Sequence, residues 1–222
     1  MKAIGSMEML SANIKNNLNN YQLQQINHYI DILLKWNKIF NLTAITDRQQ
    51  VIDRHVKEGL DVTPYCQQYI NNLSKSQLLS AKILDLGSGM GIPGIILAIM
   101  MPEQAITLLD SNNKKTSFLL QVKIELGLNN LTVITQRAQD CQQRFDLIIA
   151  RAFASCEVIL NLAQNLLIVQ GTVLAMKSNS YQQELAQLSK FNHDNWHLQV
   201  IDLKSDCANK IARYLLQFDY KG

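Results

Sequence analysis

The chain of 222 residues carries 21 Lys and Arg against 18 Asp and Glu, so its formal net charge is only +3. Charged residues make up 18% and hydrophobic residues 47%. This balance excludes a polybasic tail, a charge-driven disordered chain and a highly charged coiled coil. RNA binding stays open, because a basic patch is a local property of a surface. The length allows one domain of ordinary size, or one with a small appendage.

The compartment is predicted from three features of the chain. The longest nearly apolar run, residues 91–102, is too short to span a membrane. The N-terminus has no apolar core or cleavage site typical of a secretory signal. The chain has four widely spaced cysteines: Cys66, Cys141, Cys156 and Cys207. Free thiols in a reducing cytoplasm are the simpler interpretation of this spacing. We therefore expect a cytoplasmic protein without membrane association.

The first third of the chain has a helical pattern. Residues 21–40 repeat apolar side chains near a period of 3.6, which indicates a helix with one buried face, and residues 49–60 do the same. No strand pattern precedes residue 80. We predict a helical N-terminal cap over residues 1–75, followed by a polar linker that reaches residue 80.

From residue 81 onwards, short apolar runs alternate with helical stretches. The predicted strands are residues 83–86, 106–109, 131–134, 145–150, 172–176, 198–203 and 211–218. The predicted helices between them are residues 92–101, 114–126 and 156–167. Nearly continuous apolar strands that are each followed by a helix imply a parallel sheet buried on both faces. Residues 81–222 are therefore predicted to form a doubly wound α/β domain.

The segment from Lys82 to Gly94 is the most informative part of the sequence. An apolar strand leads into Gly87, Gly89 and Gly91, and a helix follows. Glycines allow the tight turn and a close approach of backbone to a ligand, and the helix offers unpaired N–H groups. Because the spacing of the last glycines also fits the dinucleotide-binding pattern, the glycines alone leave the cofactor open.

Two acidic residues narrow the choice of cofactor. Asp85 lies among apolar residues near the end of the first strand, and Asp110 ends the second strand, where an acid meets a ribose in nucleoside-binding folds. The alternative interpretations are a helix or turn cap for Asp85 and a turn residue for Asp110. An acid before the glycines disfavours a pyrophosphate and suits a cationic methionine group. S-adenosylmethionine is therefore favoured over NAD.

Several motifs resemble one known family. They are Asp85–Gly94, Leu108–Ser111, Arg151–Ala154, Lys35–Thr43 and the Arg54-His55 pair. Together they resemble the bacterial 16S rRNA (guanine-N7) methyltransferase G family, also called glucose-inhibited division protein B. The resemblance extends from about residue 20 to the C-terminus.

The resemblance implies a Rossmann-like class I methyltransferase, with a mostly parallel seven-stranded sheet and helices on both faces. It implies transfer of a methyl group from S-adenosylmethionine to N7 of a guanine in the 530 loop of 16S rRNA, with S-adenosylhomocysteine as product. The substrate is expected within the 30S subunit or its precursor. The cofactor positions carried over are Gly87, Ile92, Ala138, Gln139 and Arg151.

The sequence also departs from the family pattern. Met90 replaces a common Pro, Gln139 a common acid, and Glu58-Gly59 a usual Asp-Ser. The first two departures leave cofactor binding expected. The third leaves open whether the N-terminal acid keeps its role.

The chemistry of guanine N7 requires little from the protein beyond positioning. N7 has a free lone pair at neutral pH, so we expect no general base, and the enzyme must hold N7 and the methyl carbon together. The base must be unpaired or splayed out to be reached.

Arg151 is expected to position the substrate and to bridge it to the cofactor pocket. Three acids are expected in or beside the cofactor pocket: Asp85, Asp110 and Asp140. RNA contacts are expected from a rim of basic residues around this pocket: Lys114, Lys115, Arg151 and Lys177.

Other features favour plainer interpretations. His193 and His197 have helical metal spacing but no further ligands nearby, so we expect no metal. His55 is interpreted as structural, or as a guanine or phosphate contact, and Trp36 as core.

A monomer without a stable protein partner is expected. Two alternative functions are an NAD-dependent oxidoreductase that uses the same glycine loop, and a non-catalytic RNA-binding or ribosome assembly factor.

Overall fold

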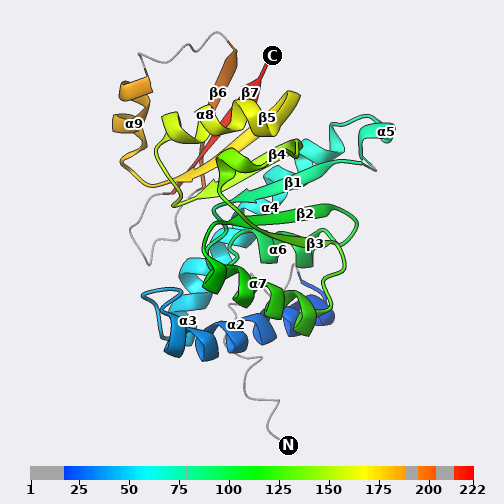
Figure 1. Ribbon diagram of the computed structural model, residues 1–222, viewed down its shortest axis with the longest axis vertical. Helices are drawn as coiled ribbons and strands as arrows, with labels where there is room; N and C mark the ends of the chain where they lie inside the picture. Colours follow the sequence, from blue (N-terminus) through cyan, green and yellow to red (C-terminus); the bar gives the residue numbers. More distant parts are fainter. Residues whose placement is uncertain (1–17, 79, 189–194, 204–212) are drawn as a thin grey trace, which may run out of the picture.

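The computed structural model describes residues 18–78, 80–188, 195–203 and 213–222, and a seven-stranded sheet runs through its centre (Figure 1). Its strands follow the order β3-β2-β1-β4-β5-β7-β6. All neighbouring pairs from β3 to β5 are parallel, whereas β7 lies antiparallel between β5 and β6. The strands are β1 (Lys82–Leu86), β2 (Ala105–Asp110), β3 (Leu131–Thr135), β4 (Phe145–Arg151), β5 (Leu167–Lys177), β6 (Trp196–Asp202) and β7 (Tyr214–Tyr220). The predicted mostly parallel seven-stranded sheet is confirmed.

Helices cover both faces of this sheet (Figure 1). The helical segments are α2 (Asn20–Phe40), α3 (Arg48–Val51), η1 (Ile52–Val56), α4 (Lys57–Asn71), α5 (Lys75–Leu78), α6 (Gly94–Met100), α7 (Asn113–Leu126), η2 (Ala138–Asp140), α8 (Cys156–Leu166) and α9 (Tyr181–Gln187). The N-terminal helices lie with α6 and α7 on one face, and α8 and α9 lie on the other. The helical N-terminal region is therefore an added layer over the α6–α7 face.

Alternating strand residues supply the core on the two faces. Ile83 and Leu108 pack with the N-terminal helices and α6, whereas their neighbours Leu84 and Leu109 pack with α8. This follows from the two-residue period of a strand, and explains why the central strands are apolar throughout. Because the N-terminal helices and the sheet share one continuous core, the domain boundary placed after residue 75 remains a prediction.

Some predicted boundaries differ from the observed ones. The first helix of the α/β region begins at Gly94 rather than residue 92, because Pro93 occupies its N-cap position. The segment predicted as a helix over residues 49–60 is helical from residue 48 to residue 71 and contains one π-helical turn, η1. Strand β5 begins at Leu167, five residues before the predicted start at residue 172, and its pairing with β4 is interrupted by an irregularity.

Gly59 allows two helices to approach closely. A Cβ atom at this position would lie 2.7 Å from Cγ1 of Ile96, so α4 rests on α6 with its backbone. Two other N-terminal contacts tie α2 to α7: the Gln25 side chain donates to the Leu126 carbonyl over 2.9 Å, and Trp36 contacts Phe118 with ring centroids 5.8 Å apart. Trp36, predicted as a core residue, is partly buried and packs against the edge of the core.

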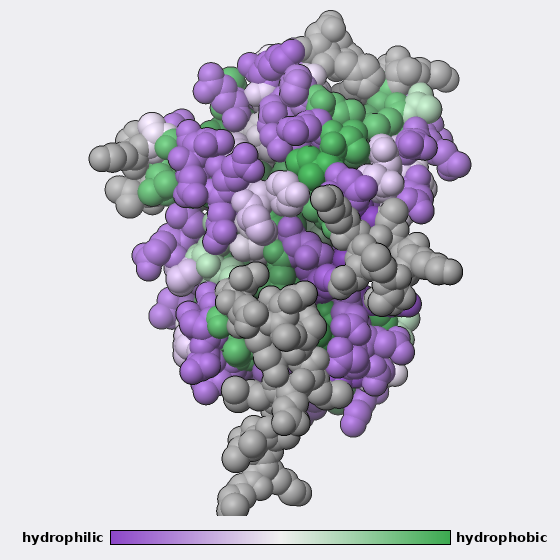
Figure 2. Space-filling model, turned by 180° about the vertical axis from the view of Figure 1, so that it is seen from behind, coloured by the Kyte–Doolittle hydropathy of each residue, from purple (hydrophilic) through white to green (hydrophobic). Residues whose placement is uncertain are grey.

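The remaining surface is largely polar. Seen from behind, polar residues cover most of the molecule, and apolar surface is concentrated in the upper half (Figure 2). No helix among the described residues has the length and apolar character to cross a membrane. Cys66, Cys141 and Cys156 are free and buried, while Cys207 and His193 lie outside the described residues.

Candidate active site

The glycine loop after β1 has the conformation that its sequence predicts. Gly87, Gly89 and Gly91 all have positive φ, at 72°, 59° and 91°. The Gly87 N–H donates to the Leu109 carbonyl over 2.8 Å, and a Cβ at Gly87 would lie 2.1 Å from Cδ2 of Phe153. Only a residue without a side chain fits between the sheet and Phe153 in this conformation.

Asp85 forms the helix cap that was the alternative interpretation of this residue. It is 1% exposed, and its Oδ2 accepts a hydrogen bond of 3.0 Å from the Gly94 N–H at the start of α6. Burial raises the pKa of this carboxyl group to about 7, against the opposing effects of the Gly94 hydrogen bond and of Arg151. Direct contact between Asp85 and a cofactor remains a prediction.

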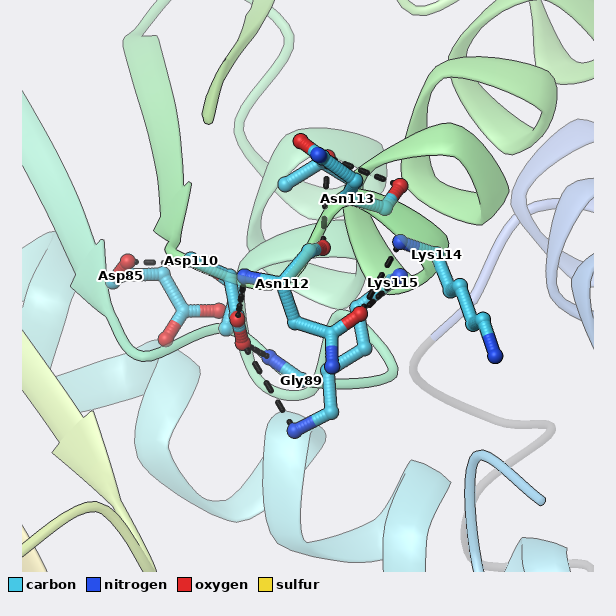
Figure 3. A network of polar contacts seen from close by, with 9 residues as sticks. Asp85, Gly89, Asp110, Asn112, Asn113, Lys114 and Lys115 are labelled. Atoms are coloured by element: carbon cyan, nitrogen blue, oxygen red, sulfur yellow. Dashed lines mark hydrogen bonds and ion pairs between the residues drawn. The ribbon is translucent and has the colours of Figure 1, made fainter. Parts of the chain in front are cut away.

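Asp110 holds the glycine loop and the start of α7 together (Figure 3). Its Oδ2 accepts from the Gly89 N–H over 2.9 Å, and its Oδ1 accepts from the Asn112 N–H over 2.9 Å. The Lys115 ammonium lies 3.9 Å from Oδ2, whereas the Lys114 side chain points away from this carboxylate (Figure 3). A carboxylate is thereby fixed at the C-terminal edge of the sheet, where open α/β folds bind nucleosides.

A cavity of about 420 Å³ opens beside Asp110 at this edge. It brings together Gly87, Asp110, Ala138 and Gln139, four of the predicted cofactor-binding residues. The predicted residues Asp85, Gly89, Gly91 and Ile92 are not among its lining residues, and their observed contacts shape the loop behind it. Arg137 also lines the cavity. Arg137 was not predicted from the sequence, although it directly precedes Ala138 after β3.

The residues of this cavity fit a nucleoside cofactor. The Asp110 carboxylate can accept hydrogen bonds from ribose hydroxyl groups, and the glycine at position 87 leaves room for a ligand close to the backbone. An acid held under the loop at Asp85 and another at its rim suit a cationic ligand better than a pyrophosphate.

A second cavity, of about 470 Å³, lies on the other side of Phe153. The two cavities share Ala152 and Phe153, and the second is also lined by Glu58, Arg151 and Lys177. Ala152 has a φ of 49°, a strained conformation for a residue with a side chain, of the kind that concentrates at functional sites. One wall therefore lies between the two cavities, which we name by the roles we propose for them: the cofactor-side cavity beside Asp110 and the substrate-side cavity beside Arg151.

Arg151 is held from two sides by the N-terminal helical region. Its Nε lies 2.5 Å from Oε2 of Glu58, and its Nη2 lies 2.8 Å from Nδ1 of His55. The Arg151 side chain is 17% exposed and lines the substrate-side cavity, while the cofactor-side cavity is lined without it. The Glu that replaces the usual Asp at position 58 thus has an ion-pair partner.

Three of the four residues of the predicted basic rim line a cavity: Lys115 lines the cofactor-side cavity, Arg151 and Lys177 line the substrate-side cavity, and Lys114 lines neither. The Lys177 ammonium donates to the Ala154 carbonyl and to the Glu184 carboxylate, each over 2.7 Å, and its side chain is 10% exposed. Lys177 therefore lies at the substrate-side cavity but has internal partners. Asp140 is exposed and lines neither cavity, so the acids at the pocket are Asp110 and, behind it, Asp85.

The sheet order, the glycine loop after β1 and the acid that ends β2 define a class I methyltransferase fold. Solved structures agree with this class. An O-methyltransferase from Bacillus cereus in complex with S-adenosylhomocysteine is similar with a TM-score of 0.61 and 15% identity, over 87% of this chain and 91% of that one. An rRNA methylase from Streptococcus thermophilus has a TM-score of 0.51 and 11% identity, over 71% and 95%.

Sequence comparison is more specific. The chain belongs to the family of rRNA small subunit methyltransferase G, whose family model matches residues 22–210. Proteins named ribosomal RNA small subunit methyltransferase G are 43% identical in Hydrogenovibrio crunogenus, over 73% of this chain and 71% of the relative, and 42% identical in Pseudomonas aeruginosa, over 74% and 73%. The protein is therefore a methyltransferase enzyme, and the oxidoreductase and non-catalytic alternatives are set aside.

Proposed function

We propose that this protein transfers a methyl group from S-adenosylmethionine to N7 of a guanine in the 530 loop of 16S rRNA. The observation that carries the proposal is the pair of cavities that meet at Ala152 and Phe153. Relatives of up to 43% identity whose names specify small-subunit rRNA support the substrate class. As it acts on ribosomal RNA, we propose a cytoplasmic location and action as a monomer on the 30S subunit or its precursor.

The residues of the cofactor-side cavity would hold the cofactor. Asp110 would accept hydrogen bonds from the ribose, the glycine loop would receive the methionine end, and Ala138 and Gln139 would border the adenine. When bound, S-adenosylmethionine supplies an electrophilic methyl group on a positively charged sulfur. The Asp110 carboxylate beside the loop favours that positive charge.

The substrate-side cavity would receive the guanine. Phe153 is 37% exposed on the wall between the cavities, so its ring offers a flat apolar surface for a base that has left its stack. Arg151 presents donors in a fixed orientation, which suits an acceptor such as guanine O6. Since N7 needs no deprotonation, positioning of the base is the main contribution of these residues.

Labelled-methyl transfer to 30S subunits that lack the modification, followed by mapping of the modified base, tests the proposal. We expect one labelled guanine, modified at N7, with the wild-type protein. Arg151→Ala should bind S-adenosylmethionine within about threefold of wild type but lose methyl transfer by about 10²-fold, the usual cost of a misplaced reacting group. Label in another nucleotide, or none with folded wild-type protein, would refute the function, and wild-type turnover by Arg151→Ala would refute its substrate role.

A further inference from the structure

The family motif at Lys35–Thr43 and the Arg54-His55 pair have no role in the chemistry described so far. Their contacts converge on one residue. His55 is 7% exposed and places one ring nitrogen against Arg151 and the other against Thr43, over 2.8 Å and 3.0 Å. His55 also lies in η1, a π-helical turn, a rare geometry that concentrates at functional sites.

The hydrogen-bond roles of the His55 ring follow from its partners. Arginine can only donate, so Nδ1 of His55 must be the acceptor of the Arg151 hydrogen bond. Nε2 therefore carries the ring proton and donates a hydrogen bond to Oγ1 of Thr43. Burial, and to a lesser extent the charge of Arg151, lower the pKa of His55 to about 4, which agrees with a neutral ring at physiological pH.

Thr43 is itself fixed by Asn37, which is buried near the end of α2. The Thr43 N–H donates to the Asn37 side-chain oxygen over 2.9 Å, and the Asn37 amide donates back to the Thr43 carbonyl over 2.9 Å. The same amide lies 3.4 Å from the carbonyl of Ile45, whose own N–H donates to Oγ1 of Thr43. The segment after α2 is thus held by paired hydrogen bonds, and it in turn orients the histidine.

We infer that Asn37, Thr43 and His55 are positioning residues for Arg151, and that they fix its guanidinium through an acceptor nitrogen of a neutral imidazole. The Glu58 carboxylate forms an ion pair with Nε of the same guanidinium. One N–H group is thereby hydrogen-bonded to His55 and Nε is paired with Glu58, so the planar group lines the substrate-side cavity in one orientation. This inference rests on the proposed role of Arg151 at the guanine.

Two variants of His55 separate positioning from packing. His55→Asn retains an oxygen close to the place of Nδ1 and so can still accept from Arg151, whereas His55→Gln places its amide near Nε2 and can reach only Thr43. We expect His55→Gln to lower kcat for 30S methylation by about 10²-fold and His55→Asn to keep at least about tenfold more activity than His55→Gln. The KM for S-adenosylmethionine should change by less than about threefold in both, since Arg151 lines the other cavity.

Equal losses in the two variants, or wild-type kcat in His55→Gln, would overturn the inference. Absence of methyl transfer by the wild-type protein would instead refute the proposed function. A second measurement does not depend on activity or on the folding of the His55 variants. In a 15N NMR spectrum of the wild type at about pH 7, the His55 ring should be neutral with its proton on Nε2, since Nδ1 accepts from Arg151. A proton on Nδ1 would also overturn the inference.

Discussion

Asp85 and Asp110 lie near the C-terminal ends of neighbouring strands, yet the structure gives them different roles. Asp85 points under the glycine loop and caps α6, whereas Asp110 bonds two backbone N–H groups and borders the cofactor-side cavity. The difference arises because Asp85 sits one residue before the strand end and is covered by the loop, while Asp110 is the last residue of β2. Their effects on the protein should therefore differ.

Asp110→Asn should weaken S-adenosylmethionine binding by about tenfold or more. The variant loses the charge that strengthens the hydrogen bond from Gly89 and that would accept from the ribose, and a charge-assisted hydrogen bond contributes about 1.5–3 kcal/mol. Isothermal titration calorimetry measures the Kd. Asp140→Asn is the matched control, because Asp140 is exposed and lines neither cavity, so its Kd should equal that of the wild type. Equal affinity in both variants would argue against a cofactor role for Asp110.

Asp85 should make the stability of the protein fall as the pH rises. Its pKa is about 7 in the folded protein, against 3.8 as its ordinary value, so the folded state binds more protons here between pH 4 and pH 7. The stability that protonated Asp85 contributes is complete below pH 4 and is lost as the pH rises through 7. Asp85→Asn cannot ionise. We expect its free energy of unfolding, relative to wild type, to be higher at pH 7.5 than at pH 5 by at least about 1 kcal/mol.

Urea unfolding of both proteins at the two pH values measures this difference. Other titrating groups are common to the two proteins and cancel in the comparison. A difference that does not change with pH would show that Asp85 has the same charge in the folded and unfolded states, and so would contradict the prediction.

At the scale of secondary structure, helix α2 supports the glycine loop from outside the α/β region. Tyr29 is fully buried, and its hydroxyl donates to the Met90 carbonyl within the loop over 2.8 Å. Met90 replaces a common Pro of the family at this point, and its carbonyl is held regardless of that exchange. The N-terminal layer therefore contributes to both cavities: α2 holds the loop, and η1 and α4 hold Arg151.

Tyr29→Phe should destabilise the protein by roughly 1–3 kcal/mol, because it leaves the buried Met90 carbonyl without its partner. A looser loop should also raise the Kd for S-adenosylmethionine by several-fold. Tyr21→Phe on the same helix is the control: Tyr21 is 63% exposed, and its change should stay within about 0.5 kcal/mol. Chemical unfolding and calorimetry measure both effects. Equal behaviour of the two variants would refute support of the loop by α2.

In the molecule as a whole, the net charge of +3 is a sum that hides two kinds of cation. Some form ion pairs with acidic side chains, and others are exposed to solvent. Arg151 and Lys177 are paired with Glu58 and Glu184 inside the substrate-side cavity. Arg137, which lines the cofactor-side cavity, and Lys114, at the start of α7 and outside that lining, are exposed. Few exposed cations at the site imply few phosphate contacts, and the affinity for RNA should then depend only moderately on salt.

Lys114→Gln should reduce the slope of log Kd against log salt by about 0.7–1, the contribution of one phosphate contact. Lys123→Gln is the matched control at the other end of α7 and should leave the slope unchanged. Filter binding to 30S subunits at several salt concentrations measures both slopes. Affinity that does not fall with added salt would contradict an electrostatic contribution to RNA binding altogether.

Features that depend on local patterns follow from the amino-acid sequence without knowledge of the fold. The alternation of apolar strands and helices predicted the sheet, and the glycines predicted a turn with positive φ, because each of these follows from the backbone freedom and side-chain period of nearby residues. The motifs at Asp85–Gly94 and Arg151–Ala154 indicated the family. They could not distinguish a carboxylate that caps a helix from one that borders a cavity.

Contacts between residues of different elements become known only from the folded chain. Glu58 and His55 lie more than 90 positions before Arg151, and Lys177 and Glu184 belong to different elements, so no local pattern predicts these pairs. Burial also decides what these side chains do. A lysine or arginine that is exposed on the surface is a free cation, whereas one that lines a cavity donates to fixed partners inside the protein. The motif Lys35–Thr43 had no role assigned from the sequence, and we propose one because folding places Thr43 against His55, which contacts Arg151.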